Sequence, residues 1–214
     1  MCKKKHMEKY ILSAENYSVY EATEECLAEL SEFVVTENFK HHSSDYSCVN
    51  YEREIREVLA EERGYRDHSR IFLARDNKGN LVGSIRVFKW DRKEKLPIEK
   101  IFNICPLNSI GNHPSYSFWH IGRLAVSSDA SIPSIHLFKH LMALAIEPVA
   151  HDTNAFMIAE IDSKLLRVMN ALGFQTVALG APINYLASDT VPVYSTRAGL
   201  LDFYNRYREM KPAS

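Results

Sequence analysis

The sequence has little glycine and little proline, with eight residues of each in a chain of 214. This scarcity argues against collagen-like repeats, glycine-rich linkers and long disordered tails. No apolar run approaches the roughly 20 residues that span a bilayer. The basic start MCKKKHMEKY has no apolar stretch behind it that would make a signal peptide. We therefore expect a protein without a membrane span that stays in the cytoplasm.

The cysteines are isolated, and no metal-ligand spacing is present. No C-x-x-C pair occurs, and the adjacent His41 and His42 would not share a face of a helix. The four cysteines are Cys2, Cys26, Cys48 and Cys105. We expect reduced thiols, no metal site and no tightly bound cofactor.

Charge of one sign is not in excess overall, because 26 basic and 27 acidic side chains leave a net charge of −1. The distribution is uneven: residues 1–62 hold 7 basic and 14 acidic side chains, and residues 63–214 hold 19 and 13. A nucleic-acid-binding protein would show a more concentrated basic face, so we exclude that class. The basic second part suits an anionic small molecule or an acidic protein partner.

Hydrophobic periodicity predicts one domain over residues 1–214. Strands are expected at 17–22, 70–75, 81–90, 117–126, 155–161, 174–179 and 190–196. Helices are expected from Thr23, as an N-cap, to Val34, and over 51–65, 133–147, 163–173 and 200–210, with Pro133 in a first turn and Gly173 at a helix end. The charged faces of the helix over 51–65 are expected to be solvated. This order indicates an α+β (mixed α/β) fold around a mostly antiparallel sheet flanked by helices.

The element order resembles the GNAT acyltransferase fold over about residues 15–195. The best local matches are the hairpin at 70–90, the central strand with the helix after it, and the strand–helix–LGF unit at 155–174. The resemblance implies that strands 117–126 and 155–161 splay apart. It also implies that the pantetheine arm of an acyl thioester inserts between them like an added strand.

Three blocks resemble the acyl-homoserine-lactone synthases more closely. They are GSIRVF (83–88), IEKIF (98–102) and FWHIGRLAV (118–126). The residues that match the family pattern are Arg86, Phe102, Trp119, Arg123 and Val126. His120 stands where that family has Glu, and Gly122 stands where it has Ser. The segment GAPINYLASDTVPVY (180–194) is similar to the related N-acyl amino acid synthases, and the resemblance implies substrate binding by Tyr185.

Departures from these families bear on both substrates. The N-terminal block that shapes an S-adenosylmethionine pocket is absent, since residues 23–65 hold no Trp and a single Asp. The loop Val126–Ser131 lacks the glycines with which ordinary members bind the diphosphate of coenzyme A, and it carries an acid. The absence of these glycines is compatible with an acyl carrier protein as the donor. The backbone at Leu124, Ala125, Val126, Ser127 and Ser131 is expected to bind the donor. Met169 stands where ordinary members have a proton-donating Tyr.

Amide formation from a thioester needs a neutral amine and a stabilised oxyanion. His120 is the candidate general base, and its alternative is a hydrogen-bonded core histidine. Arg86 and Arg123 either bind the carboxylate of an amino-acid acceptor or pair with Glu160 or Asp162. Because strict alternation puts residues 120 and 123 on opposite faces, both reach one site only through a bulge, which Gly122 would permit.

Apolar residues at the expected cleft either wall an acyl-chain tunnel or fill the core. They are Phe102, Trp119, Phe138, Leu141 and Met142. Two basic groups are either solvated or dock an acidic acyl carrier protein. One group is Lys89, Arg92, Lys93, Lys95 and Lys100, and the other is Lys139, Lys164 and Arg167.

These features lead to one hypothesis and three alternatives. The hypothesis is an N-acyltransferase of the N-acyl amino acid synthase type. It would move a fatty acyl group from acyl carrier protein, or from acyl-CoA, to the amine of an amino acid. The alternatives are an acyl-homoserine-lactone synthase with an unusual acceptor pocket, a coenzyme A-dependent acetyltransferase acting on a small amine, and a catalytically silent module that binds a lipid or a carrier protein. The oligomeric state stays open.

Overall fold

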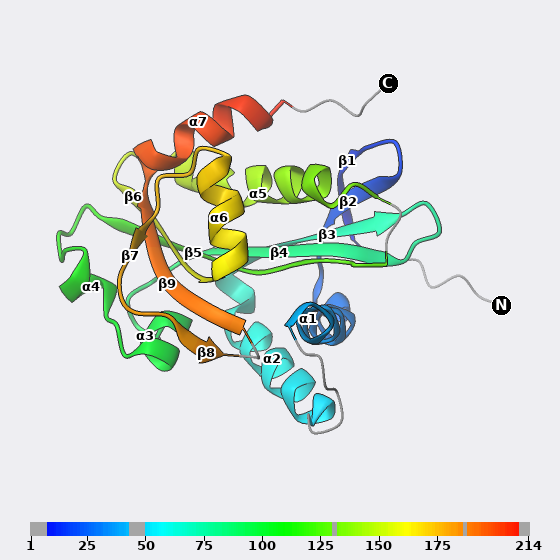
Figure 1. Ribbon diagram of the computed structural model, residues 1–214, viewed down its shortest axis with the longest axis horizontal. Helices are drawn as coiled ribbons and strands as arrows, with labels where there is room; N and C mark the ends of the chain where they lie inside the picture. The colour runs from blue at the N-terminus through cyan, green and yellow to red at the C-terminus, as the bar shows by residue number, and fades with distance from the viewer. Residues whose placement is uncertain (1–7, 43–49, 130–131, 186–187, 210–214) are drawn as a thin grey trace.

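The computed structural model describes residues 8–42, 50–129, 132–185 and 188–209. Its centre is one sheet of nine strands in the order β1-β2-β3-β4-β5-β6-β9-β7, with β8 paired to β9 (Figure 1). The pairing of β5 with β6 is parallel, and every other pairing is antiparallel. The predicted mostly antiparallel α+β architecture is confirmed.

The strands are β1 (Lys9–Ser13), β2 (Tyr17–Glu21), β3 (Ser69–Asp76), β4 (Leu81–Lys89), β5 (Ser117–Val126), β6 (Ala155–Asp162), β7 (Val177–Ala178), β8 (Ile183–Tyr185) and β9 (Ser188–Thr196). The α-helices are α1 (Leu27–His42), α2 (Tyr51–Tyr65), α3 (Pro97–Phe102), α4 (Pro106–Ser109), α5 (Ser134–Ala150), α6 (Ser163–Ala171) and α7 (Arg197–Tyr207). Two short 3₁₀ turns lie at Glu24–Cys26 and Arg66–His68.

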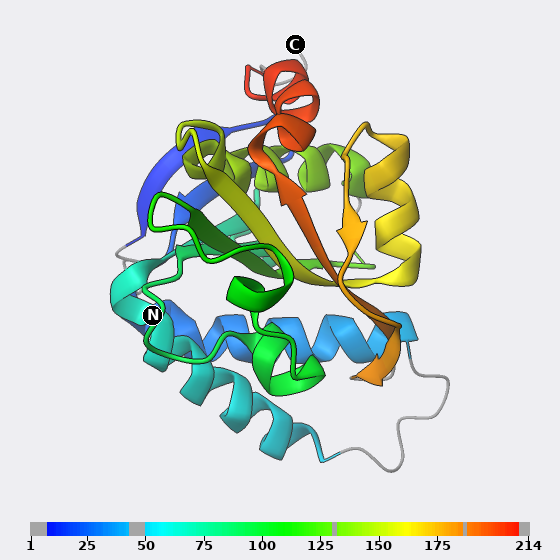
Figure 2. The ribbon, with the colours of Figure 1, turned by 90° about the vertical axis from the view of Figure 1, so that its left-hand side faces the viewer.

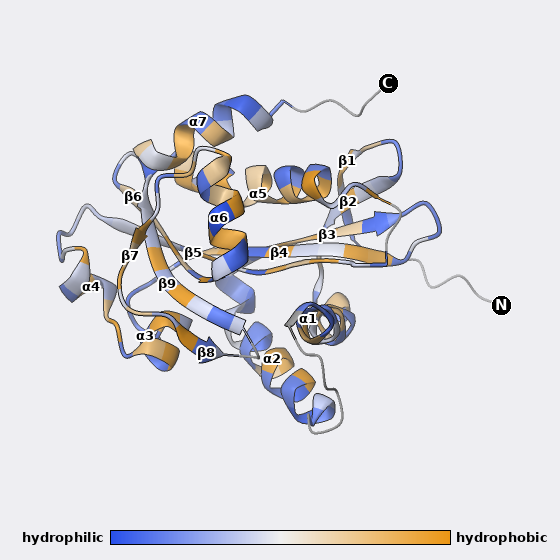
Figure 3. Ribbon diagram, in the orientation of Figure 1, coloured by the Kyte–Doolittle hydropathy of each residue, from blue (hydrophilic) through white to orange (hydrophobic). Residues whose placement is uncertain are grey.

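The helices form two layers. Helices α5, α6 and α7 cover one face of the sheet, and α1 and α2 cover the other (Figures 1 and 2). The largest apolar cluster joins α5 and α7 to the central strands through residues such as Leu137, Leu141 and Phe203, all at 0% exposure. Helix α2 is more hydrophilic than α5 (Figure 3). The core is therefore concentrated on the α5 side of the sheet.

The two ends of α6 show how the local sequence sets the boundaries of a helix. Asp162 caps the start of the helix by accepting hydrogen bonds from the backbone N–H groups of Lys164 and Leu165. At the other end, Gly173 has a φ of 94°, and the N–H of Phe174 donates to the carbonyl of Met169 at 3.1 Å. This arrangement matches a Schellman motif, so the predicted role of Gly173 is confirmed.

Most predicted elements are present, with four omissions. The sequence did not indicate β1, α3, α4 or β8. Thr23 precedes the 3₁₀ turn, but its hydroxyl donates to Glu25 and caps no backbone group. Pro133 is the residue before α5, one position outside the predicted first turn. Cys26 and Cys105 have free thiols, while Cys2 and Cys48 lie outside the described residues.

The predicted divergence of β5 and β6 is present. The two strands pair only from Ser117–Ala155 to His120–Ile158. Beyond that point β6 continues to pair with β9 as far as Asp162, while β5 continues beside β4 alone. A gap in hydrogen bonding therefore lies between the carboxyl ends of the two central strands.

The predicted bulge lies in β5, one residue later than the glycine that suggested it. Gly122 pairs with Arg86 and Ala125 pairs with Ser84, so two residues of β5 face one residue of β4. Arg123 has a φ of 54°, in the left-handed region, and its carbonyl accepts a hydrogen bond from the Ser84 hydroxyl at 2.8 Å. The bulge changes the side to which β5 side chains point.

Within the described residues, none of the helices combines the length and apolar character required to cross a bilayer.

The close packing of α5 on β4 leads to a stability prediction. A Cβ added at Gly83 would lie 2.9 Å from Leu137 Cδ2 and 3.0 Å from Leu141 Cδ1, and both leucines are fully buried. We expect Gly83→Ala to lower the free energy of unfolding by about 1–3 kcal/mol, because the overpacked core must shift. Urea denaturation measures this. Gly64→Ala, in α2 with no atom within 4 Å of the new Cβ, is the control and should stabilise slightly.

Candidate active site

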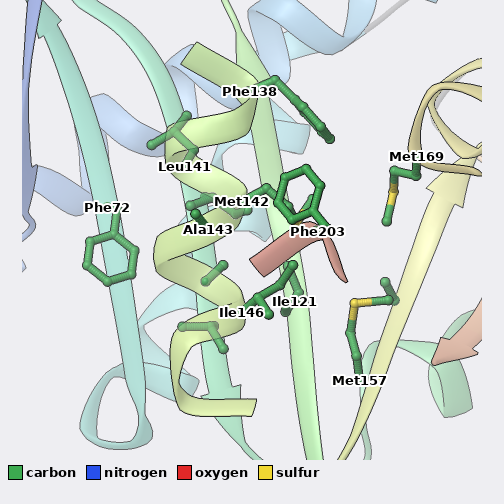
Figure 4. Packing of buried hydrophobic residues seen from close by; sticks show 14 of the residues in the cluster. Phe72, Ile121, Phe138, Leu141, Met142, Ala143, Ile146, Met157, Met169 and Phe203 are labelled. Atoms are coloured by element: carbon green, nitrogen blue, oxygen red, sulfur yellow. The ribbon is translucent and has the colours of Figure 1, made fainter. Parts of the chain in front are cut away.

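A cavity of about 820 Å³ lies where β5 and β6 part. Its apolar wall includes Phe138 and Met142 from α5, Met157 from β6 and Met169 from α6, which face one another in Figure 4. Its polar wall is formed by Glu61, Arg86, His120, Arg123 and Glu160. One space thus joins a surface suited to a hydrocarbon chain and a cluster of titratable groups.

The open edge of β5 forms part of this cavity. Residues 121–128 all line it, and among the described strands β4 alone pairs with β5 beyond His120. Backbone groups on an unpaired strand edge can bind an extended molecule as an added strand would. The predicted donor-binding residues Leu124, Ala125, Val126 and Ser127 lie on this edge, whereas Ser131 lies outside the described residues.

His120 and Glu160 form a buried pair across the cleft. His120 Nε2 lies 2.9 Å from Glu160 Oε2, and the imidazole is 2% exposed. The ring stacks on Phe88, and its Nδ1 lies 3.4 Å from Arg86 Nη2. The second carboxylate oxygen, Glu160 Oε1, is buried without a hydrogen-bond partner in the described part of the chain. A carboxylate–imidazole pair with one free acceptor atom can take up a proton.

Both predicted arginines are paired, but with partners that the sequence did not indicate. Arg86 Nη1 donates to Glu62 Oε1 at 2.5 Å, and Arg123 Nε donates to the same oxygen at 2.7 Å. Arg123 Nη2 lies 2.8 Å from Glu61 Oε2. The predicted pairing with Glu160 or Asp162 is therefore wrong, because Glu160 pairs with His120 and Asp162 caps α6.

The partners come from α2, whose charged faces were expected to be solvated. That expectation is wrong for Glu62, which is 0% exposed, and for the half-buried Glu61. A signal was present in the sequence: Glu62 follows Ile55 and Val58 at helical spacing, so an acid occupies the apolar stripe. A carboxylate on a buried stripe requires a cation.

The network favours the charged forms of Glu61 and Arg123. Burial alone would raise the pKa of Glu61, but Arg123 and Arg86 outweigh burial and lower it. Burial alone would lower the pKa of Arg123, whereas Glu61 and Glu62 raise it above its usual value. Burial raises the pKa of Tyr185, which lines the same cavity, so its hydroxyl remains a donor at neutral pH.

Gly122 leaves room for the imidazole of His120. A Cβ at position 122 would lie 2.8 Å from His120 Cε1 and 3.5 Å from its Nδ1. The two residues are two positions apart on one strand, before the bulge, and therefore share a face. The two exchanges noted in the sequence, His for Glu and Gly for Ser, are thus sterically linked.

A carboxylate from α1 occupies the loop after β5. Glu37 is buried, and its Oε2 accepts hydrogen bonds from the Ser128 N–H at 2.9 Å and the Ser128 hydroxyl at 3.1 Å. Lys40 Nζ lies 3.0 Å from Glu37 Oε1 and 2.6 Å from Asp129 Oδ2. These contacts join segments about 90 residues apart, and no local pattern indicates them.

Comparisons with known proteins point to the fold. No family model matches the chain, and no curated protein matches it in sequence. Its structure is similar to FeeM, an N-acyl amino acid synthase from uncultured soil microbes, with a TM-score of 0.62, 14% identity and 91% and 98% of the two chains covered. It is similar to the acyl-homoserine-lactone synthase LasI at a TM-score of 0.55 and 12% identity, with 90% and 96% covered. It is also similar to FdhC, a nucleotide-linked sugar GNAT, at a TM-score of 0.52 and 10% identity, with 94% and 97% of the two chains covered.

The chain has the GNAT fold. The resemblance inferred from the three sequence blocks is thereby confirmed at the level of fold, including the parting of the two central strands.

The remaining predicted residues of this GNAT-fold protein divide into two groups. Phe138, Met142 and Tyr185 line the cavity, together with Lys164 at the start of α6. Trp119 and Phe102 are not among the described residues that line it. The Trp119 indole donates to Asp152 at 3.2 Å, and Phe102 packs in a separate cluster beneath the sheet. For these two residues the structure favours the core interpretation.

The basic loop after β4 is partly engaged within the protein. Lys89 pairs with Asp152 at 3.0 Å, Arg92 donates to the backbone carbonyl of Tyr116 at 2.7 Å, and Lys100 donates to the Tyr65 hydroxyl at 3.1 Å. Of the two predicted basic groups, only Lys164 contributes to the cavity.

Removing the shared carboxylate should be costly for stability. We expect Glu62→Ala to lower the free energy of unfolding by about 3–5 kcal/mol, because it leaves two buried guanidinium groups without their common partner. Chemical denaturation measures the loss. Glu57→Ala, which breaks an exposed ion pair with Arg53 on the same helix, is the control and should change stability little. Equal effects of the two variants would contradict the buried network.

The steric link between Gly122 and His120 can be measured by a double-mutant cycle. We expect Gly122→Ala to destabilise the protein by about 1–3 kcal/mol, because the new methyl group overlaps the ring. In a His120→Ala background the same substitution should be close to neutral, which leaves a coupling energy of about 1–3 kcal/mol in urea denaturation. Additive effects would show that the ring does not need this space.

Proposed function

We propose that this protein is an N-acyltransferase that moves a fatty acyl group from the thioester of an acyl carrier protein to the amine of an amino acid. The observation that carries the proposal is the cavity at the parting of β5 and β6. It combines an unpaired strand edge, an apolar wall and a carboxylate–imidazole pair. A coenzyme A thioester is the alternative donor.

The two walls suit the two parts of an acyl thioester. The edge of β5 offers backbone groups to the amides of a pantetheine arm, as in added-strand recognition. The side chains of Phe138, Met142 and Met169 offer a surface on which a hydrocarbon chain loses contact with water, worth about 0.8 kcal/mol per buried CH₂.

The polar wall suits the chemistry of the acceptor. An ammonium that enters the site can give one proton to Glu160 Oε1, which is free to accept it, with His120 sharing the charge through Oε2. The neutral amine then attacks the thioester carbon, the C–N bond forms and the C–S bond breaks. The sulfur leaves as a thiolate, since a thiol has a pKa of about 8.5, and the proton held by the pair restores the thiol. The second proton, lost by nitrogen as it becomes the amide, passes to the pair and then to solvent. N–H groups of the β5 edge and the Tyr185 hydroxyl are donors for the oxyanion.

Two observations bear on the class of the acceptor. The similarity to FeeM, whose name describes an N-acyl amino acid synthase, supports an amino acid. The pairing of Arg123 with Glu61 and Glu62 favours a second candidate, an amine without a free carboxylate, because a carboxylate would have to share that guanidinium with two acids.

Turnover assays test the proposal. We expect an N-acyl product, detected by mass spectrometry, when the protein is incubated with medium-chain acyl carrier protein and a pool of amines. Glu160→Gln and His120→Gln should each lower kcat by about 10²-fold or more, because the proton acceptor is lost. His151→Gln, at the end of α5 and outside the cavity, should keep full activity.

Two results would contradict the proposal: no product with any acceptor, or unchanged turnover in Glu160→Gln. In the same assay, amino acids are compared with their carboxamides. Preference for the free acid supports the amino-acid class, and preference for the carboxamide supports the second candidate. Product that depends on S-adenosylmethionine would instead indicate an acyl-homoserine-lactone synthase.

A further inference from the structure

In the loop after β5, the hydrogen-bond donors that could bind an anion already bind a carboxylate of the protein itself. The Ser128 N–H and hydroxyl converge on one oxygen of Glu37, at 2.9 and 3.1 Å. Both residues line the cavity, at the end where β5 leaves the sheet. A backbone N–H beside a hydroxyl is the kind of donor pair that proteins use for phosphate oxygens. Here a carboxylate takes the place that a ligand phosphate would need.

Two basic side chains of α1 lie beside this carboxylate. Lys40 Nζ bridges Glu37 and Asp129, and His41 Nε2 lies 3.2 Å from the carbonyl of Val126. Asn38 and His41 also line the cavity. The last turns of α1 are therefore held against the loop by several contacts, so that Glu37 is a built-in component of the cavity wall. A second negative charge placed at Ser128 would meet the Glu37 carboxylate at close range.

We propose that Glu37 is a specificity-determining residue that excludes a donor carrying a diphosphate at this loop. This inference rests on the proposed function, because it concerns which thioester enters the same cavity. A coenzyme A thioester carries a diphosphate and a further phosphate on a flexible nucleotide. The Glu37 carboxylate repels the diphosphate. A pantetheine arm on a carrier protein brings one phosphate, which stays beside the surface of its own carrier.

Removing the charge at position 37 should therefore admit coenzyme A. We expect Glu37→Gln, which keeps the size of the side chain, to tighten binding of free coenzyme A about tenfold in calorimetry, because a like charge is removed from the hydrogen-bonding position. Glu37→Ala, which also frees the Ser128 N–H, should tighten it further. In turnover assays both variants should lower the KM for a medium-chain acyl-CoA and leave the KM for the same acyl group on the carrier protein within about twofold.

Glu32→Gln is the matched control. Glu32 lies on the same helix and is exposed. Its substitution removes the same charge at a position away from the loop. It should change neither coenzyme A binding nor donor preference. Thermal unfolding identifies any variant that fails to fold. If Glu37→Ala fails to fold, Glu37→Gln alone decides the question.

The outcomes separate this inference from the proposed function. Unchanged coenzyme A binding in a folded Glu37→Gln variant overturns the role of Glu37, even where turnover with acyl carrier protein is normal. Tighter coenzyme A binding without turnover from any thioester supports the role of Glu37 and contradicts the N-acyltransferase. Tight coenzyme A binding by the unmodified protein also overturns the inference.

Discussion

One buried carboxylate connects the elements on which the cleft depends. Glu62 of α2 accepts hydrogen bonds from Arg86 of β4 and from Arg123 at the bulge of β5. Arg123 has a left-handed backbone, which costs a non-glycine residue about 1–2 kcal/mol. The ion pairs with Glu61 and Glu62 and the hydrogen bond from Ser84 to the Arg123 carbonyl compensate that cost. Helix α2 thereby holds β5 on the path that leaves β6.

The bulge has a second consequence for the site. It lets His120 and Arg123 contribute to one cavity, although strict alternation would separate them. Because β5 stops pairing with β6 at His120, the imidazole lies at the point where the backbone edge becomes available. The end of β5–β6 pairing at His120 and the bulge after Gly122 therefore bring the imidazole, the open edge and Arg123 to one cavity.

Local patterns predicted most of this architecture, and contacts between distant segments account for what they missed. The hairpin of β3 and β4, the central β5 and the helix α5 carry their own periodicity, so they were predictable. Strands β1 and β8 are short and lie at sheet edges, where pairing with a neighbour stabilises them more than their own residues do. The partners of Arg86 and Arg123 were assigned to nearby β6, because periodicity does not show that α2 crosses beneath β4 and β5. An acid on the apolar stripe of α2 was the one local sign.

The contact of Glu37 with Ser128 follows from a general constraint on buried backbone. A loop N–H that points into a cavity needs a partner whenever no ligand is bound, since an unpaired buried donor costs about 1–3 kcal/mol. Proteins whose loops hold a phosphate meet this need with water or ligand, whereas here the side chain of α1 meets it permanently. Lys40 lies between Glu37 and Asp129 and balances the added negative charge. In the role we propose for Glu37, the carboxylate that accepts from the Ser128 N–H is also the charge that repels a phosphate, so donor selectivity would need no separate device.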